Sequence, residues 1–297
     1  MRLRELVRQR LPLTGLDLAG ADLAGWDLRG QDLSHCDLRG AILTGARLRA
    51  ARLDHACLDD ALLDDASLHQ ASLRHASFVR ADLCGADLSA ASVTRADFHG
   101  ARAAGASFDD ARGGAPRFAR AELRGASFAR AAIPAADLRE AELEGASIVS
   151  ARLDDAQLGA ADLTRACLDG ACLERAHAAG ALLSGASLRH IDGLWLDLGD
   201  ARLEGACFDG AQLDEARLAG AHAPASRFPR ASLRGANQRG VDARDACFRD
   251  ADLRGARLRR AVLSGADLEG AQVSLAELRL ADIAGARIGA ALRDRPR

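Results

Sequence analysis

The sequence has no tyrosine and no lysine, and its 297 residues include only 8 phenylalanines and 2 tryptophans. An ordinary globular domain of this length takes much of its core area from aromatic side chains, so leucine and alanine have to fill this interior. No apolar run approaches the roughly 20 residues of a membrane-spanning helix, so we expect no membrane partner. The charged segment 1–12 also lacks the apolar stretch of a secretory signal. We therefore predict a cytoplasmic protein, with signal-independent secretion left open.

An excess of charge of one sign is also missing. Forty arginines stand against 42 acidic residues, for a formal net charge of −2, and this balance disfavours direct binding of nucleic acid. The sequence contains no phosphate loop, no CxxC pair, no dinucleotide fingerprint and no evident pairing of a nucleophile with a base. We therefore predict a non-enzymatic protein with no catalytic residues, no cofactor-binding residues and no cofactor.

The sequence does contain a five-residue repeat. From Leu13 to Ile288, steps of five give 56 repeats without a break in phase. The central residue is Leu, Phe, Ile or Val in 49 repeats, and alanine stands two places before the centre in 46. A period of five fits neither a helix nor an ordinary strand. It fits a chain that turns a corner every five residues with two side chains inward, so that four sides close one coil.

Columns of residues 20 apart support this larger period. All eight phenylalanines are central residues, and they fall in only two of the four columns. Glycine is unevenly spread as well. The corner place, two residues after the centre, is glycine ten times in the column of Leu23 and six times or fewer in each other column. Because glycine adopts positive φ without strain, we expect this corner to require positive φ most.

The seven cysteines fit the same frame. A disulfide between neighbouring coils needs two cysteines 20 residues apart in one column, and no two cysteines of the same column have that separation. We therefore expect free thiols, as is typical of a reducing compartment.

Segments such as ADLAG at 21–25, ADLCG at 81–85 and ADLRG at 251–255 carry the pattern A(D/N)LXX. With this motif repeated over about 11–290, the chain resembles the pentapeptide-repeat family. The resemblance implies an all-β fold, a right-handed quadrilateral parallel β-helix (solenoid). The 56 repeats at four per coil give about 14 coils, and we expect a short N-terminal helical cap.

Three segments follow from this frame. Residues 1–12 are expected to form the N-terminal cap, because their apolar residues have helical spacing. Residues 13–290 form the pentapeptide-repeat β-helix, and residues 291–297 form a charged C-terminal tail. Family members that dimerise through a C-terminal helix carry more sequence there. No such helix is evident here, and the oligomeric state stays open.

One corner column contains three histidines in succession: His35, His55 and His75. Their rings are expected to stack along one edge at about 4.8 Å, and neutral imidazole is a common metal ligand. The ladder supplies no carboxylate, however, and Arg95 follows it. The three histidines are thus a candidate metal site, and the plainer interpretation is a tolerated polar corner.

The acidic residues provide one hypothesis for function. Resemblance to the quinolone-resistance and toxin self-immunity branch of the family implies binding of DNA gyrase by mimicry of duplex DNA. Mimicry requires a continuous anionic face, whereas arginines interrupt the most acidic column, that of Leu23. The candidates for such a face are Asp82, Glu122, Glu142 and Asp162.

Two other features indicate a protein partner. The segment 190–198, HIDGLWLDL, breaks the repeat pattern and places Leu194 and Trp195 at outward positions. This pair is a candidate contact patch, and the alternative is a local bulge that returns Trp195 to the wall. Residues 227–260 carry ten arginines against four aspartates. Six of these arginines occupy successive repeats and form a collar for an acidic partner or neighbouring subunits, or simply a soluble surface. The collar consists of Arg234, Arg239, Arg244, Arg249, Arg254 and Arg259.

One interior position is also unusual. Gln238 stands at the centre of a repeat, and the next centre is the small Ala243. We expect this coil to be the softest part of the repeat region, because a polar centre followed by a small one reduces apolar packing.

These features predict a non-enzymatic binding or scaffold protein that presents a rod-like β-helical surface to a protein partner. The alternative is a DNA-mimicking binder of DNA gyrase or topoisomerase that gives antibiotic or toxin resistance. The sequence does not identify the partner.

Overall fold

The structure of the protein is a computed structural model, which describes residues 3–274 and 277–289. The charged tail expected at 291–297 lies outside the described residues. The chain forms two compact units, Met1–Arg152 and Leu153–Arg297, and each is described by itself.

Regular secondary structure is sparse in the described residues. It comprises one helix, α1 (Leu3–Arg8), and two short strands, β1 (Asp267–Leu268) and β2 (Arg287–Ile288), which pair in parallel. No helix in these ranges is long and apolar enough to cross a membrane. The rest of the chain is organised by isolated parallel bridges and turns.

Helix α1 is attached to the first turns by side chains that replace the usual alanine. Gln31 donates its Nε2 hydrogen to the carbonyl oxygen of Val7 at 3.0 Å. The guanidinium of Arg4 lies 5.4 Å from the ring centre of Trp26, which is within the range of a cation–π interaction. The bulky residues that break the alanine pattern near the N-terminus therefore hold the helix.

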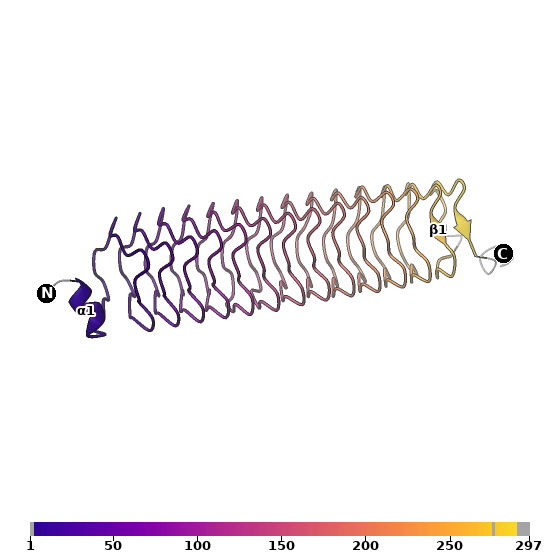
Figure 1. The fold of residues 1–297 in the computed structure, drawn as a ribbon. Helices are drawn as coiled ribbons and strands as arrows, with labels where there is room; N and C mark the ends of the chain where they lie inside the picture. Colours follow the sequence, from indigo (N-terminus) through magenta and orange to yellow (C-terminus); the bar gives the residue numbers. More distant parts are fainter. Residues whose placement is uncertain (1–2, 275–276, 290–297) are drawn as a thin grey trace. The chain divides into compact units, whose positions relative to one another are not determined.

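Within each unit, residues 20 apart pair in parallel. Asp17 pairs with Asp37, Asp37 pairs with Cys57, and such bridges recur in all four columns of both units. Backbone hydrogen bonds follow the same register, as in the bond from the Leu13 nitrogen to the Asp32 oxygen at 2.8 Å. Successive turns therefore stack in chain order within a unit (Figure 1), and the predicted period of 20 residues is confirmed as that of a β-helix.

The predicted interior is confirmed in both units. Leu33, Leu53 and Leu73, which follow one another in a column, are fully buried, and so is Ala51, which flanks Leu53. Phenylalanines form ladders of their own, in which stacked ring centres lie 4.8–5.0 Å apart. Leucine and alanine thus form most of the core, and aromatic rings reinforce it locally.

Most corners of the described residues are β-turns. The first is closed by a hydrogen bond from the Leu16 nitrogen to the Leu13 oxygen at 3.2 Å, and its third residue, Gly15, has a φ of 71°. A turn of this kind with positive φ at the third residue has type II geometry. The prediction that one corner requires positive φ most is wrong, because every column has it whether or not the residue is glycine. The glycine excess in one column has no explanation in φ. One non-glycine example from each column is His35 (60°), Ala50 (56°), Asp60 (58°) and Asp65 (55°).

Where aspartate precedes the centre of a repeat, it often stabilises the same turns. An Asp17 carboxylate oxygen accepts the backbone N–H of Ala19 at 3.1 Å, and Asp22 accepts that of Ala24 at the same distance. Aspartate favours turns through this local hydrogen bond. These repeated carboxylates therefore have a structural function in the motif.

Candidate protein-binding surface

The irregular segment 190–198 keeps the register of the β-helix. The Gly193 nitrogen donates to the Gln212 oxygen at 2.7 Å, and the Trp195 nitrogen donates to the Asp214 oxygen at 3.1 Å. No extra residue interrupts the ladder, so the alternative of a local bulge is wrong.

Gly193 explains how bulky side chains fit into this turn. A Cβ atom at this position would lie 2.9 Å from a methyl carbon of Leu213 and 3.3 Å from one of Leu196. The glycine vacates the usual central position, while Ile191 and Leu196, which replace alanine, are buried in the core. This exchange of volume keeps the interior close-packed and leaves Trp195 at the corner.

Trp195 is the centre of the predicted contact patch. Its side chain is 50% exposed and its φ is 58°, whereas Leu194 is half-buried. The left-handed backbone is uncommon for a bulky residue, and the turn at this corner requires it. The indole lines a surface hollow of about 580 Å³. The other residues that line this hollow include His177, Glu215, Arg217, Asn237 and Arg257.

Four of the six collar arginines are neutralised by acids of the same unit. Arg244 donates two hydrogen bonds to Asp242 at 2.8 and 2.6 Å, and Arg254 donates to Asp252 at 2.8 Å. These hydrogen bonds hold the pKa of both carboxyls below the usual value. The collar is therefore not a continuous belt of free positive charge. The other two collar arginines within 4.0 Å of a carboxylate are Arg234 and Arg249.

The remaining two collar arginines, Arg239 and Arg259, belong to a different arrangement. The 20-residue register places them in one column with Arg279, next to Arg257 and Arg260. All five are exposed, and none has a carboxylate partner among the described residues. The collar, which follows the chain from repeat to repeat, includes only two of the five, whereas the 20-residue column of the sequence includes all of them. We call Arg239, Arg257, Arg259, Arg260 and Arg279 the basic face.

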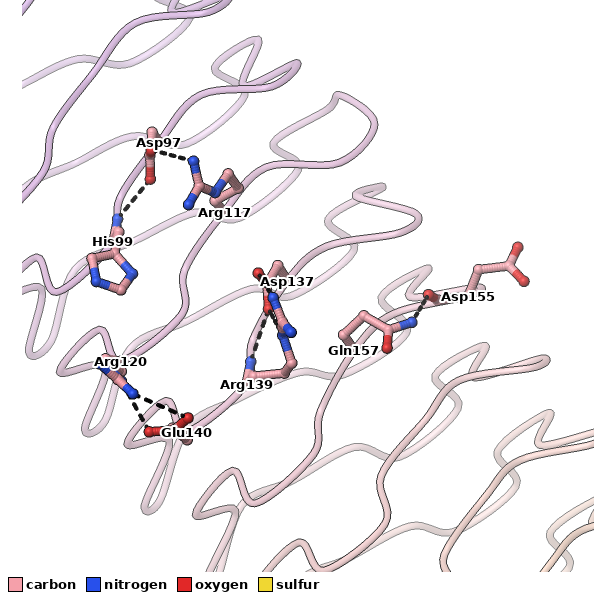
Figure 2. A network of polar contacts seen from close by, with 9 residues as sticks. All are labelled: Asp97, His99, Arg117, Arg120, Asp137, Arg139, Glu140, Asp155 and Gln157. Atoms are coloured by element: carbon pink, nitrogen blue, oxygen red, sulfur yellow. Dashed lines mark hydrogen bonds and ion pairs between the residues drawn. The ribbon is translucent and has the colours of Figure 1, made fainter.

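Arginines of the same repeat column in the first unit have a different environment. Each is bound by a carboxylate of its own turn or of the adjacent turn, in charge-assisted hydrogen bonds. The basic face is therefore a local feature of the second unit and not a general property of the repeat. The pairs in the first unit, drawn in Figure 2, are Arg117–Asp97, Arg120–Glu140 and Arg139–Asp137, at 2.8, 2.9 and 2.7 Å.

An apolar hollow borders the basic face. Leu280 is 63% exposed and lines a hollow of about 420 Å³ together with Leu258 and three arginines of the basic face. One of these arginines, Arg257, also lines the hollow of Trp195. The basic face thus connects two hollows, each with a large apolar side chain.

The histidine ladder is stacked as predicted. Ring centres of His35 and His55, and of His55 and His75, lie 4.9 Å apart, with interplanar angles of 3° and 2°. Face-to-face rings place their nitrogens in parallel rows and do not direct them to one point. In the described ranges, no group of three or more His, Cys, Asp or Glu side chains is placed to hold a metal ion. The plainer interpretation of this ladder, a tolerated polar corner, agrees with this geometry, and metal binding by the three histidines stays untested.

Basic side chains neutralise much of the acidic column proposed for DNA mimicry. Arg102 lies 2.8 Å from Asp82 and 3.8 Å from Glu122. A second arginine, two residues after Glu122, lies 3.1 Å from Glu142. The fourth candidate, Asp162, belongs to the second unit and accepts a backbone hydrogen bond of its own turn at 3.0 Å.

The family is established by comparison with known sequences. The profile described as pentapeptide repeats matches the chain in eight stretches, which together cover most of its length. The chain belongs to the pentapeptide-repeat family. The matched stretches are residues 13–49, 51–90, 81–112, 117–165, 141–177, 197–235, 211–250 and 256–289.

Solved structures of other pentapeptide-repeat proteins are similar to the chain. HetL of the cyanobacterium Nostoc sp. strain PCC 7120, involved in heterocyst differentiation regulation, is 24% identical over 92% of this chain and 95% of its own, with a TM-score of 0.33. Rfr23 of the cyanobacterium Cyanothece 51142 is 22% identical over 38% of this chain and 88% of its own, with a TM-score of 0.32. QnrB1, a plasmid-mediated fluoroquinolone resistance protein, is 18% identical over 71% of this chain and 90% of its own, with a TM-score of 0.30. No curated protein sequence matches the chain.

The cysteines of this pentapeptide-repeat protein are free thiols, as predicted. Burial raises the pKa of Cys36, Cys57 and Cys84, and it raises the pKa of Cys172 to about 11. A reactive cysteine needs the opposite shift, which positive neighbours or a helix N-terminus provide. These four thiols have the properties of structural side chains.

Proposed function

We propose that the protein is a non-enzymatic scaffold that binds a protein partner through the surface around Trp195. One observation carries this proposal: a half-exposed indole lines a hollow of about 580 Å³. Tryptophan is enriched among the residues that dominate the energetics of protein interfaces, where it fills pockets away from water. A partner that covers Trp195 removes its apolar ring from solvent, at roughly 25 cal/mol per Å² of apolar area.

We further infer that the scaffold is a right-handed quadrilateral coil of about 14 turns. Four bridging columns within a 20-residue period support four sides, and 56 repeats at four per turn support the count. Parallel crossover connections are right-handed in almost all proteins. In a solenoid each turn contacts only its neighbours, so substitutions on the outer surface are expected to change binding without changing the fold.

Replacing Trp195 by alanine is expected to abolish capture of the partner, with a loss of about 2 kcal/mol or more in binding free energy. The measurement is affinity capture from native cell lysate, followed by titration of the captured protein against wild type and variant. Leu182→Ala is the matched control, because Leu182 is an exposed apolar residue of the same unit outside the hollow. Equal capture by Trp195→Ala and wild type would remove Trp195 from the interface.

DNA mimicry of gyrase receives less support, because arginines interrupt and neutralise the acidic column. We expect no protection of DNA gyrase in a supercoiling assay with a fluoroquinolone, with and without the purified protein. Rescue of supercoiling that disappears when Glu122 and Glu142 are changed to arginine would reverse this ranking. Rescue that survives both substitutions would place the gyrase contact on another surface.

A further inference from the structure

We propose that the basic face binds an acidic segment of the protein partner, which inserts an apolar side chain beside Leu280. The proposal extends the proposed function, because it names the chemistry of the partner and a second point of contact. It depends on three observations: the arginines without acidic partners, the apolar hollow next to them, and the acids at the border of the surface.

The first observation is the concentration of unpaired charge. Five exposed arginines of the basic face lie in adjacent turns of one column, and none has a carboxylate partner among the described residues. Elsewhere in the chain, arginine is commonly bound by an acid of the same or the next turn, as with Arg117 and Arg139. Guanidinium groups match carboxylates in planar, two-pronged geometry. An external carboxylate would therefore replace the internal partner that this face lacks.

The second observation is the spacing of the charges and the hollow. Arg239, Arg259 and Arg279 occupy successive turns, which are about 4.8 Å apart, and the Arg260 nitrogen donates to the Leu280 oxygen at 3.0 Å. Side chains on one side of an extended peptide repeat about every 6.6–6.8 Å, a spacing that long arginine side chains can follow. The hollow of about 420 Å³ beside Leu280 is large enough for a leucine-sized side chain.

The third observation distinguishes an acidic peptide from a nucleic acid. Glu215 and Asp155 line the hollow of Trp195, and Glu277 lines the hollow of Leu280. A nucleic acid carries a negative phosphate on every nucleotide. Its phosphates would therefore be repelled by these carboxylates along the surface. A short acidic segment places its charges only where the arginines stand, and its apolar side chain fits a hollow that a phosphate chain does not use.

The test uses a fluorescein-labelled synthetic peptide that alternates Glu with Leu, and measures its affinity for the full-length protein by fluorescence anisotropy. We expect saturable binding that weakens as salt is raised, because exposed charges are screened. The same peptide with Gln in place of Glu, or with Ser in place of Leu, is expected to bind at least tenfold more weakly. The proposal requires that both control peptides lose affinity.

A pair of charge-reversal variants locates the site. Arg257→Glu combined with Arg259→Glu is expected to weaken peptide binding at least tenfold. Arg165→Glu combined with Arg230→Glu makes the same change in net charge at two exposed arginines of other columns and is expected to leave affinity within twofold. Thermal unfolding of both variants checks that the fold is retained.

The tryptophan content allows an independent readout. The chain has two tryptophans and no tyrosine, so in a Trp26→Phe protein the emission comes from Trp195 alone. Because Arg257 lines both hollows, we expect the peptide to shift this emission, and we expect no shift in the Arg257→Glu, Arg259→Glu background.

Three outcomes would overturn the proposal: equal affinity for the Glu and Gln peptides, equal loss in both charge-reversal variants, or tighter binding of an oligothymidylate through the same arginines. The last result would assign the face to single-stranded nucleic acid. If the peptide fails to bind while Trp195→Ala still abolishes capture of the partner, the proposed function stands and the acidic segment is excluded. If the peptide binds while Trp195→Ala leaves capture of the partner unchanged, the acidic segment stands and the proposed contact at Trp195 is excluded.

Discussion

Replacing Phe98 by alanine lowers the free energy of unfolding of the first unit by about 3–5 kcal/mol, the usual cost of truncating a buried phenylalanine. Phe98 is 1% exposed. Its ring stacks on Phe78 and Phe118 at centroid distances of 5.0 and 4.8 Å, and meets Phe108 edge-on at 5.6 Å. The interior of a solenoid turn is fixed by the turns on both sides, so the cavity cannot close by collapse. We therefore expect a cost at the upper end of the range.

The measurement is denaturant unfolding together with hydrogen exchange of amides in the turns next to Phe98, since solenoid turns can open locally. Phe98→Leu restores the commonest central residue and is expected to cost less than about 1.5 kcal/mol. Leu62→Ala, at an exposed leucine of the same unit, serves as the surface control. If Phe98→Ala lowers the free energy of unfolding no more than Leu62→Ala does, burial and stacking of the Phe98 ring do not stabilise the first unit, and the prediction is wrong.

The core could be predicted because a single physical rule governs most repeats. A narrow coil admits one large apolar and one small side chain per side, and most repeats from Leu13 onward have this pair. Corner conformation could not be predicted from glycine content. Positive φ occurs at every corner of the described residues, and residues as different as His35 and Arg130 accept its cost because the ladder around them is complete.

The candidate site was predictable only in part. The position of Trp195 follows from the repeat frame alone, because a corner residue points away from a core that is already full. Charge pairing joins neighbours two residues apart in one turn, as with Arg244 and Asp242, or 18 to 20 apart in adjacent turns, as with Arg117 and Asp97. A collar read along the chain includes arginines that such neighbours neutralise. Spacing alone does not predict the basic face, because Glu277 has the right spacing to pair with arginines of this face, whereas its carboxylate accepts backbone N–H groups in the structure.

Gln238→Leu is expected to raise the free energy of unfolding of the second unit by about 1–3 kcal/mol, because it removes a buried polar group that lacks a partner. Gln238 is 1% exposed, and its Nε2 atom has no hydrogen-bond partner among the described residues. Its column neighbours Leu218 and Leu258 are equally buried, so the substitution restores an apolar ladder. The leucine side chain has a volume similar to that of glutamine, so we expect the substitution to need no rearrangement of the neighbouring side chains.

The measurement is thermal and denaturant unfolding of Gln238→Leu, with Gln238→Ala as the control. Removing the amide without refilling its volume leaves a void, so we expect the alanine variant to gain less or to lose stability. A fall in stability of Gln238→Leu would mean that the Nε2 hydrogen is satisfied in solution, for example by an ordered water. Gln238 lies beneath the basic face, between Arg239 and Asn237 in the chain, and its side chain is inside the coil. We therefore expect the stabilised variant to bind the acidic peptide with unchanged affinity, since the amide contributes to the interior and not to the surface.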